Sequence, residues 1–234
     1  MEVAMNDAIY VITGASDGLG EQLALSLIAD GKTVVCLSRS KPSFNNVEWI
    51  ETDLSSEESI DRASAKLNSD ARRIAALVNN AGIMSAKKFN QPDFKDIVSM
   101  MNVNASGHIY LTSKLGNKLN SDCSDIVNVS STVGLKGVKD QQAYTASKWA
   151  VRGFSASLKE QFQDTAVRVI SFCTGGMRND MGIKVGIPML DPENWMDPKD
   201  VANLLKTILY LPRNMEVSEI VINRKKPVDS KENK

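Results

Sequence analysis

Short apolar runs alternate with amphipathic segments of helix length along the chain. The runs are rich in β-branched residues, as are strands buried on both faces of a parallel sheet. They predict strands at residues 9–13, 33–38, 47–51, 74–79, 125–130, 167–172 and 217–222. The segments between them predict helices at residues 18–30, 56–68, 93–119, 143–162 and 198–210.

This alternation is typical of an α/β fold in which right-handed crossovers cover both faces of a doubly wound, mostly parallel sheet with helices. A length of 234 residues suits one domain, which we expect at residues 1–223. Ser55 and Glu58 fit a capping box at the start of the second helix. Residues 224–234 are a mixed-charge run that we expect to be disordered.

Charge and hydropathy narrow the classes of partner. Lys plus Arg and Asp plus Glu each total 28, so no net field attracts the chain to nucleic acid or to an anionic membrane. No apolar stretch reaches the roughly 18 residues of a membrane span, and the start "MEVAMNDAIY" lacks the pattern of a secretory signal. We therefore expect a cytoplasmic protein with no nucleic-acid or membrane partner.

The residues that most often bind metals are few and scattered. Cys36, Cys123 and Cys173 form no C-x-x-C pair, so we expect reduced thiols packed among apolar side chains. His108 is the only histidine and lies in an apolar run, so we expect it to pack in the core as well. Neither a metal site nor a Ser-His-Asp triad is predicted.

The first predicted strand leads into a glycine-rich turn, "TGASDGLG" at residues 13–20, and then into a helix. Glycines let the backbone approach a pyrophosphate closely, and the first turn of the helix offers it unpaired N–H groups. A turn of this kind after the first strand of a parallel sheet favours a dinucleotide site. A glycine-rich turn without a ligand is the alternative.

The end of the second predicted strand indicates which dinucleotide is bound. An acidic residue there would accept a hydrogen bond from the ribose 2′-hydroxyl of NAD, but the chain has Ser38, Arg39 and Ser40. A guanidinium suits a 2′-phosphate, so NADP(H) is favoured over NAD(H). Asp17 in the glycine loop weakens this preference, and an arginine paired on the surface is the alternative.

Two tyrosines carry a lysine four positions later, namely Tyr144 with Lys148 in "QAYTASKWAV" and Tyr110 with Lys114 in "YLTSK". Residues at this spacing share one face of a helix, so either pair could be an ordinary helix surface. Tyr144 follows a predicted strand that ends in "VNVSS", and the carboxyl edge of a parallel sheet binds ligands. Tyr110 lies well inside its own predicted helix.

These motifs, in this order, resemble those of the classical short-chain dehydrogenase/reductases over about residues 8–222. The family's T-G-x-x-x-G-x-G stands at residues 13–20, its N-N-A-G at 79–82 and its Y-x-x-x-K at 144–148. Its helix asparagine falls on Asn104, and its serine, thirteen positions before the tyrosine, on Ser131. Ile97 stands thirteen positions before Tyr110, so the resemblance selects the other tyrosine.

The resemblance implies a single-domain Rossmann fold with a seven-stranded sheet. It also implies an NADP(H)-dependent oxidoreductase, such as a carbonyl reductase, that transfers hydride between nicotinamide and a carbonyl or secondary alcohol. Its catalytic residues would be Asn104, Ser131, Tyr144 and Lys148. Ser131 would bind the substrate oxygen, Lys148 would also hold the nicotinamide ribose, and Asn104 would hold a water in a proton relay. The residues implied to contact the cofactor are Thr13, Gly14, Ser16, Gly18, Leu19, Gly20, Ser38, Arg39, Asp53, Leu54, Asn80, Ala81, Gly82, Tyr144, Lys148, Thr174 and Gly175.

Electrostatics gives Tyr144 and Lys148 a physical reason to act together. Lowering the pKa of a phenol from about 10 to about 7.5 requires roughly 3.4 kcal/mol. An ammonium about 5 Å away supplies roughly 3.3 kcal/mol at an effective dielectric constant of about 20. The sequence therefore predicts that Lys148 lowers the pKa of Tyr144 enough for proton transfer near neutral pH.

The chain departs from the family after the sixth predicted strand, in "FCTGGMRND". Thr174 stands where the family has proline and Arg178 where it has threonine, so a looser loop beside the nicotinamide is expected. Residues 176–197 form a long connection without strong periodicity, which predicts a substrate lid. No residue in this connection identifies the substrate.

Two other functions remain open. One is a catalytically silent dinucleotide-binding sensor or scaffold, although such a protein would not need all four catalytic residues. The other, a sugar-nucleotide epimerase, would need a larger substrate domain than the residues after 175 supply. The family also implies a homodimer or homotetramer built through the helices near 103–119 and 144–162.

Overall fold

The computed structural model describes residues 8–178 except 86, 88 and 92, together with residue 181 and residues 194–225. Most of the predicted lid at 176–197 and most of the predicted tail at 224–234 lie outside the described residues.

Seven strands form one sheet in the order β3-β2-β1-β4-β5-β6-β7, and all neighbours pair in parallel. The predicted doubly wound sheet is therefore confirmed, and it is parallel throughout. The strands are β1 (Ala8–Thr13), β2 (Thr33–Ser38), β3 (Glu48–Glu51), β4 (Arg73–Asn79), β5 (Asp125–Ser131), β6 (Arg168–Thr174) and β7 (Glu219–Ile222).

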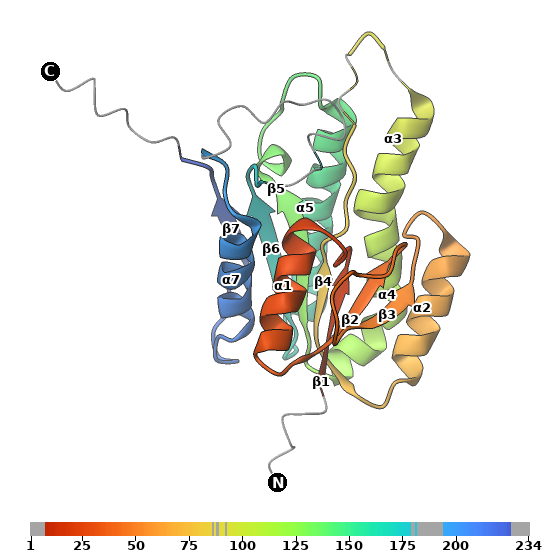
Figure 1. Cartoon of the computed structure of the whole chain (residues 1–234), viewed down its shortest axis with the longest axis vertical. Helices are drawn as coiled ribbons and strands as arrows, with labels where there is room; N and C mark the ends of the chain where they lie inside the picture. The colour runs from red at the N-terminus through yellow and green to blue at the C-terminus, as the bar shows by residue number, and fades with distance from the viewer. Residues whose placement is uncertain are drawn as a thin grey trace, which may run out of the picture.

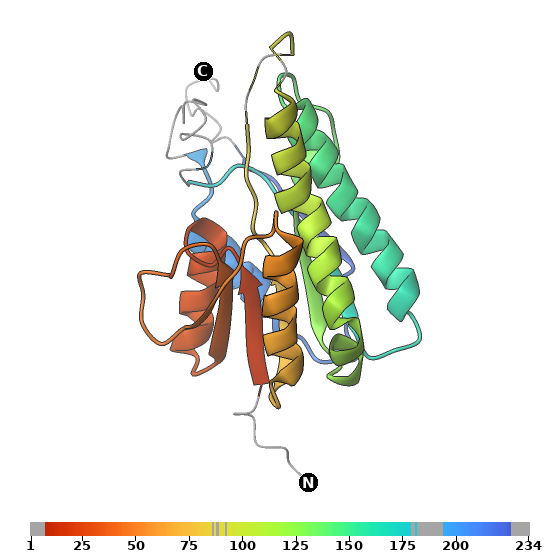
Figure 2. The ribbon, with the colours of Figure 1, turned by 90° about the vertical axis from the view of Figure 1, so that its right-hand side faces the viewer.

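Helices cover both faces of the sheet (Figures 1 and 2). α3 (Phe94–Met101) leads into α4 through one π-helical turn (Asn102–Ser106), so the uninterrupted helix predicted at 93–119 is wrong in this detail. In Figure 2, α3 and the start of α5 rise next to each other beyond the ends of the strands. One face carries α1 (Gly18–Ala29) and α7 (Pro198–Leu209), and the other carries α2 (Glu57–Ser69), α4 (Gly107–Ser121) and α5 (Gln142–Phe162).

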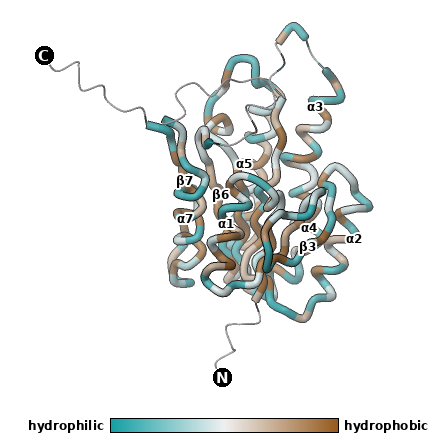
Figure 3. Tube along the Cα trace, in the orientation of Figure 1, coloured by the Kyte–Doolittle hydropathy of each residue, from teal (hydrophilic) through white to brown (hydrophobic). Residues whose placement is uncertain are grey.

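Two apolar layers hold these helices on the sheet. One layer joins the strands to α1 and α7 through fully buried side chains such as Leu23 and Leu205. The other joins them to α2, α4 and α5 through side chains such as Leu67 and Leu115. Figure 3 shows hydrophobic positions concentrated along the strands in the middle of the molecule. Burying each such leucine contributes about 1.5–3 kcal/mol to folding, so the two layers fix the sheet edge that carries the candidate site.

The predicted capping box of α2 is wrong by one residue. Ser56 is the N-cap, and its hydroxyl accepts a hydrogen bond from the N–H of Ser59 at 3.3 Å. The hydroxyl of Ser55 instead donates to the carboxylate of Asp53 at 2.7 Å. Ser55 therefore stabilises the turn before α2, whereas the sequence pattern assigned it to the helix N-cap.

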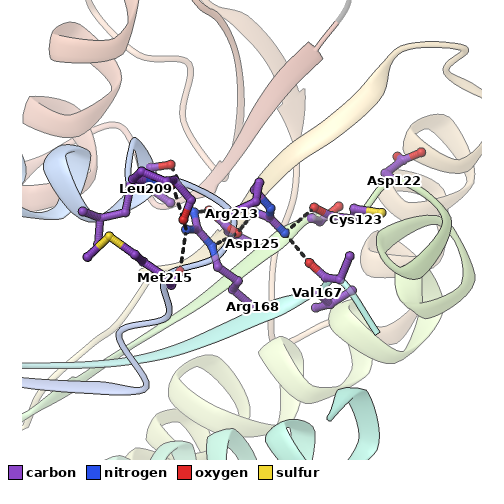
Figure 4. Close-up of polar contacts among 12 residues, drawn as sticks. Asp122, Cys123, Asp125, Val167, Arg168, Leu209, Arg213 and Met215 are labelled. Carbon is purple, nitrogen blue, oxygen red and sulfur yellow. Dashed lines mark hydrogen bonds and ion pairs between the residues drawn. The ribbon is translucent and has the colours of Figure 1, made fainter. Parts of the chain in front are cut away.

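A buried ion pair fixes the amino ends of β5 and β6 (Figure 4). Asp125 and Arg168 are only 3% and 5% exposed, and two hydrogen bonds of 2.8 and 2.6 Å join their side chains. Arg213 also pairs with Asp125. The remaining N–H groups of Arg168 donate to main-chain carbonyl oxygens at and just after the end of α7, in Leu209, Leu211, Pro212 and Met215.

Replacing Asp125 with Asn should lower the free energy of unfolding by about 3–5 kcal/mol, because the charge of Arg168 then stays buried without its counter-ion. Urea unfolding at neutral pH measures this loss. The matched control is Glu58→Gln, which breaks the exposed pair with Arg62 and should change stability little. A loss below about 1 kcal/mol in the Asp125 variant would show that this pair does not stabilise the fold.

Candidate active site

Four neighbouring strands of the sheet end in or beside residues singled out from the sequence. β1 ends at Thr13, β4 at Asn79, β5 at Ser131 and β6 at Thr174. Because the strands are parallel, these ends meet at one edge of the sheet. The strand order reverses between β1 and β4, and such a reversal opens a crevice at the carboxyl edge where folds of this kind bind ligands.

The glycines after β1 allow close packing against the turn that follows β4. Gly14 has a φ of 68°, and a Cβ there would lie 2.8 Å from the Cα of Ala81. A Cβ on Gly20 would lie 2.5 Å from the side-chain nitrogen of Asn80. Gly18, with a φ of 59°, begins α1. The turn thus presents backbone N–H groups and the start of a helix to the crevice, which fits a pyrophosphate.

Two residues that the resemblance placed in contact with the cofactor also hold the glycine turn together. Thr13 is fully buried, and its hydroxyl accepts hydrogen bonds from the N–H groups of Asn80 and Ala81 at 2.9 and 3.0 Å. The side chain of Asn80 donates to the carbonyl oxygens of Thr13 and Gly14 at 3.0 and 3.2 Å. These side chains hold the glycine turn in place, and contact with the cofactor stays a prediction for both residues.

Leu19 and Leu54 are also buried, on opposite sides of the sheet. Leu54 packs so closely against α4 that a Cβ on Gly107 would lie 2.2 Å from its carbonyl oxygen. Ser16, in contrast, is exposed on the glycine turn. Of these three predicted cofactor residues, Ser16 is the one whose side chain is open to a ligand.

The guanidinium of Arg39, which is expected beside the ribose 2′-position of the dinucleotide, is open to a ligand. Arg39 is exposed and forms no ion pair with a described residue. Ser38 is buried and donates its hydroxyl to the carbonyl oxygen of Ser40 at 2.7 Å. Asp53 accepts hydrogen bonds from the hydroxyl and N–H of Ser55, which lower the pKa of Asp53, and the charge of Arg39 lowers that pKa further. Arg39 therefore lies near the turn that Asp53 forms before α2.

Tyr144 and Lys148 lie one turn apart on α5, beside the end of β5. The Nζ of Lys148 lies 5.8 Å from the centre of the Tyr144 ring and donates to the carbonyl oxygen of Val129 at 3.0 Å. The Ser130 hydroxyl donates to the main-chain carbonyl of Lys148 at 2.9 Å. Ser131, the last residue of β5, lies close enough to Tyr144 to lower the pKa of its phenol.

The predicted lowering of the Tyr144 pKa is wrong. Burial raises the pKa of Tyr144 to about 12, although the hydrogen bond with Ser131 acts in the opposite direction. Burial also lowers the pKa of Lys148 to about 8. Desolvation disfavours the charged form of both groups, and the estimate from sequence counted only the attraction between them. Tyr144 is therefore a protonated phenol at neutral pH.

Asn104 lies fully buried on the π-helical turn, with its side chain locked in place. Its Oδ1 accepts the N–H of Ile83 at 2.8 Å, and its Nδ2 donates to the Ile83 carbonyl at 2.9 Å and to the Ser147 hydroxyl at 3.0 Å. A Cβ on Gly82 would lie 3.5 Å from the Oδ1 of Asn104 and 3.6 Å from the Nζ of Lys148. The turn after β4 therefore passes beside both predicted catalytic residues.

The second tyrosine and lysine pair belongs to a surface contact between helices. Lys114 pairs with Asp61 of α2 at 2.8 Å, and the Tyr110 hydroxyl donates to the same carboxylate at 3.0 Å. This arrangement fits the interpretation of Tyr110 and Lys114 as a helix face. Tyr110 and Lys114 can therefore serve as an internal control for Tyr144 and Lys148 on α5.

The described part of the loop after β6 is held by packing and hydrogen bonds. Thr174 is buried, and the N–H of the glycine after it donates to the carbonyl oxygen of the last residue of β7 at 2.8 Å. A Cβ on Gly176 would lie 2.6 Å from the ring of Trp195, so the second glycine is required by close packing. Arg178 pairs with Asp197, the N-cap of α7, at 2.5 Å. These contacts hold residues 174–178 in place in the described structure, and the looser loop expected from the double glycine stays a prediction.

Sequence reasoning missed His108, which it interpreted as a packing residue. The side chain is buried, but its ring nitrogens lie 3.0 Å from the Thr13 hydroxyl and 3.2 Å from the Asn104 carbonyl oxygen. Its position four residues after Asn104, on the same side of the helix, was a signal that could have placed it in this site.

The three cysteines differ in their exposure to solvent. Cys36 and Cys173 are buried as expected, but Cys123 is exposed, so the prediction that all three pack among apolar side chains is wrong for it. In the part of the chain that the structure describes, no cluster of three or more His, Cys, Asp or Glu side chains could hold a metal ion. None of the helices described there is long and apolar enough to cross a membrane.

The chain is similar to proteins called oxidoreductases over nearly its whole length. An uncharacterized oxidoreductase of Staphylococcus saprophyticus is 28% identical over 238 aligned residues, which cover 94% of this chain and 98% of the relative. An uncharacterized oxidoreductase of Staphylococcus aureus strain N315 is 27% identical, with 93% of this chain and 97% of the relative covered.

Solved structures share the fold. The closed form of a serine dehydrogenase complexed with NADP+ has a TM-score of 0.82 at 24% identity, covering 92% of this chain and 94% of that protein. An alcohol dehydrogenase from the archaeon Thermococcus sibiricus, complexed with 5-hydroxy-NADP, has a TM-score of 0.83 at 23% identity, covering 94% and 99%. A 4-hydroxyisoleucine dehydrogenase complexed with NADH has a TM-score of 0.81 at 21% identity, covering 92% and 96%.

The family model for short chain dehydrogenases matches residues 8–187, which include the glycine turn, the turn after β4 and the helix that carries Tyr144 and Lys148. Together with the parallel sheet and the arrangement at its carboxyl edge, this match shows that the chain belongs to the short-chain dehydrogenase family of oxidoreductases.

Proposed function

We propose that the protein is an NADP(H)-dependent oxidoreductase that transfers hydride between nicotinamide and a carbonyl or secondary alcohol, with Tyr144 as general acid and base. The supporting observation is the convergence of the Ser131, Tyr144 and Lys148 side chains with Asn104 at the carboxyl edge of the sheet, beside the glycine turn. The structural relatives named above carry NADP+, a modified NADP or NADH, which supports a nicotinamide dinucleotide as the cofactor class.

A nicotinamide held beside Tyr144 and Lys148 would supply the hydride or accept it. The hydroxyl groups of Ser131 and Tyr144 hold the substrate oxygen, and Tyr144 donates its proton as that oxygen becomes an alkoxide. Lys148 is oriented by its hydrogen bond to Val129 and keeps further N–H groups for the nicotinamide ribose. Asn104 fixes the turn after β4 through Ile83, so that the turn stays beside the lysine.

The protonation state of Tyr144 favours carbonyl reduction at neutral pH. Because burial raises the pKa of Tyr144, the phenol carries its proton and can donate it directly. Alcohol oxidation needs the phenolate, which the buried environment disfavours. The protonated Tyr144 therefore supports carbonyl reduction, which is also the direction that an NADPH pool would drive.

Replacing Tyr144 with Phe should reduce hydride transfer at least about a hundredfold, the lower end of what general acid catalysis supplies. The assay follows the absorbance of reduced nicotinamide with a panel of ketones, quinones and aldehydes, using NADPH and NADH. The matched control is Tyr110→Phe, which removes the same hydroxyl from the other tyrosine and lysine pair and should leave turnover unchanged.

Unchanged turnover in the Tyr144 variant would refute its role as the general acid. Dinucleotide binding by the wild type, without turnover of any substrate in the panel, would favour the alternative of a silent sensor or scaffold on the same fold. Measuring the dissociation constant of NADPH in the same variants separates a loss of chemistry from a loss of binding.

We further propose that Arg39 selects NADP(H). Replacing it with Ala should raise the dissociation constant of NADPH about tenfold, the size of one charge-assisted hydrogen bond, and change that of NADH little. Lys41→Ala removes an exposed charge from the same loop and is the control for general electrostatic attraction. Tighter binding of NADH than of NADPH by the wild type would reject this assignment.

We also propose a homodimer or homotetramer built through α4 and α5. Large apolar side chains are exposed on these helices and on α3, among them Phe94 and Trp149, which are 78% and 48% exposed. Size-exclusion chromatography with light scattering should give the mass of a dimer or tetramer. Trp149→Glu should lower that mass, whereas Leu25→Glu on α1, on the other face of the sheet, should not. A monomeric wild type would reject the proposal.

A further inference from the structure

His108 stands where α4 begins, directly after the π-helical turn, and only 3% of it is exposed. Its Nε2 lies 3.0 Å from the hydroxyl oxygen of Thr13, and its Nδ1 lies 3.2 Å from the carbonyl oxygen of Asn104. Thr13 is the first residue of the glycine turn, and Asn104 is one of the predicted catalytic residues. The ring therefore bridges two parts of the site that are 91 residues apart in sequence, at positions 13 and 104.

Counting protons at Thr13 fixes the direction of one of these hydrogen bonds. The hydroxyl oxygen of Thr13 has two lone pairs, and both are used, because it accepts the N–H groups of Asn80 and Ala81. Its own proton must point elsewhere, and the Nε2 of His108 at 3.0 Å is a closer acceptor than the carbonyl oxygen of Val78 at 3.3 Å. An unprotonated Nε2 on His108 gives the Thr13 proton the shorter of these two hydrogen bonds.

The other ring nitrogen gives the same answer independently. The carbonyl oxygen of Asn104 can only accept, so the Nδ1 of His108 must carry the ring proton. A charged ring would direct an Nε2–H at the hydroxyl of Thr13, which has no free lone pair. Burial, opposed only in part by the hydrogen bond to Asn104, and the charge of Lys148 lower the pKa of His108 to about 3, which agrees with a neutral ring.

The carbonyl oxygen that the ring holds belongs to a π-helical turn, where the usual hydrogen-bond ladder of the helix is interrupted. The N–H of Gly107 bonds to Asn102, five residues earlier, instead of four. Such turns widen the helix and change the direction of its carbonyl groups. At this turn the Asn104 carbonyl accepts the proton of the His108 ring, so the ring holds the turn from the side of α4.

We propose that His108, as the neutral Nδ1–H tautomer, is a positioning residue that aligns the main-chain carbonyl of Asn104 with the glycine turn through Thr13. The inference rests on the proposed function, because that carbonyl would then be held for the proton relay while Thr13 holds the turn that binds the dinucleotide. His108 itself touches neither substrate nor cofactor.

The single histidine makes the tautomer directly measurable. Long-range proton–nitrogen correlation spectra of the protein labelled with ¹⁵N-histidine should show one imidazole, protonated on Nδ1, that does not titrate between about pH 5 and 8. Adding NADPH should shift these signals. A ring protonated on Nε2, or one that titrates in this range, would overturn the proposal.

Two substitutions separate the two hydrogen bonds. His108→Asn places an amide N–H near the position of Nδ1 and loses the acceptor for Thr13, so the NADPH dissociation constant should rise about tenfold, with kcat changed less than about twofold. His108→Gln places an amide oxygen near the position of Nε2 and leaves the Asn104 carbonyl without its donor. In this variant kcat should fall about tenfold and the NADPH dissociation constant should change less than about twofold.

Leu115→Val, in the core two turns further along α4, is the control for a general loss of packing. Equal changes in binding and turnover in both His108 variants, or no change in either, would reduce the residue to a structural role and reject the proposal. If the wild type turns over no substrate, the proposed function fails, but the tautomer and the NADPH dissociation constants still decide the role of His108.

Discussion

The candidate site depends on how closely the turn after β1 approaches the turn after β4. The hydroxyl of Thr13 accepts two backbone N–H groups across this gap, and a Cβ on Gly14 would come within 2.8 Å of Ala81. Any side chain at that glycine would separate the two turns. Since the turn after β4 also passes beside Asn104 and Lys148, the same displacement would disturb the proposed catalytic residues as well as the proposed dinucleotide site. The close contact between these two turns thus positions both parts of the candidate site.

The cost of desolvation changes how the tyrosine and lysine pair works. Attraction between opposite charges would favour a phenolate beside an ammonium, but burial disfavours both charged forms. With the pKa of Tyr144 raised to about 12 and that of Lys148 lowered to about 8, the stable form at neutral pH is a neutral phenol beside a lysine that is largely still charged. A phenol of this acidity still gives its proton readily to an alkoxide, which is a much stronger base. The pair is therefore better suited to protonate a product than to deprotonate a substrate.

Features set by the local sequence, such as the strands, were predicted well. Contacts between segments far apart in the sequence were not. The seven strands follow from short β-branched runs, and each observed strand overlaps its predicted range. The π-helical turn at Asn102–Ser106 was missed because apolar residues continue through it at helical spacing. Both tyrosine and lysine pairs have the same local spacing, and Tyr144 was distinguished only by the strand that precedes it and by the order of the motifs along the chain. The polar role of His108 depends on Thr13, which no local pattern connects to it.

The ion pair of Asp125 and Arg168 was missed for the same reason, since its partners come from segments far apart in the sequence. It lies at the amino ends of the strands, where each N–H of the arginine has an acceptor.

Hydrogen bonding is less complete at the carboxyl edge of the sheet. Among the described residues, buried side-chain atoms without a hydrogen-bond partner include the Oδ1 of Asn79 at the end of β4 and the Oγ1 of Thr145 next to Tyr144. Both atoms lie beside residues of the predicted site, since Asn79 ends the strand next to β1 and Thr145 follows Tyr144 on α5.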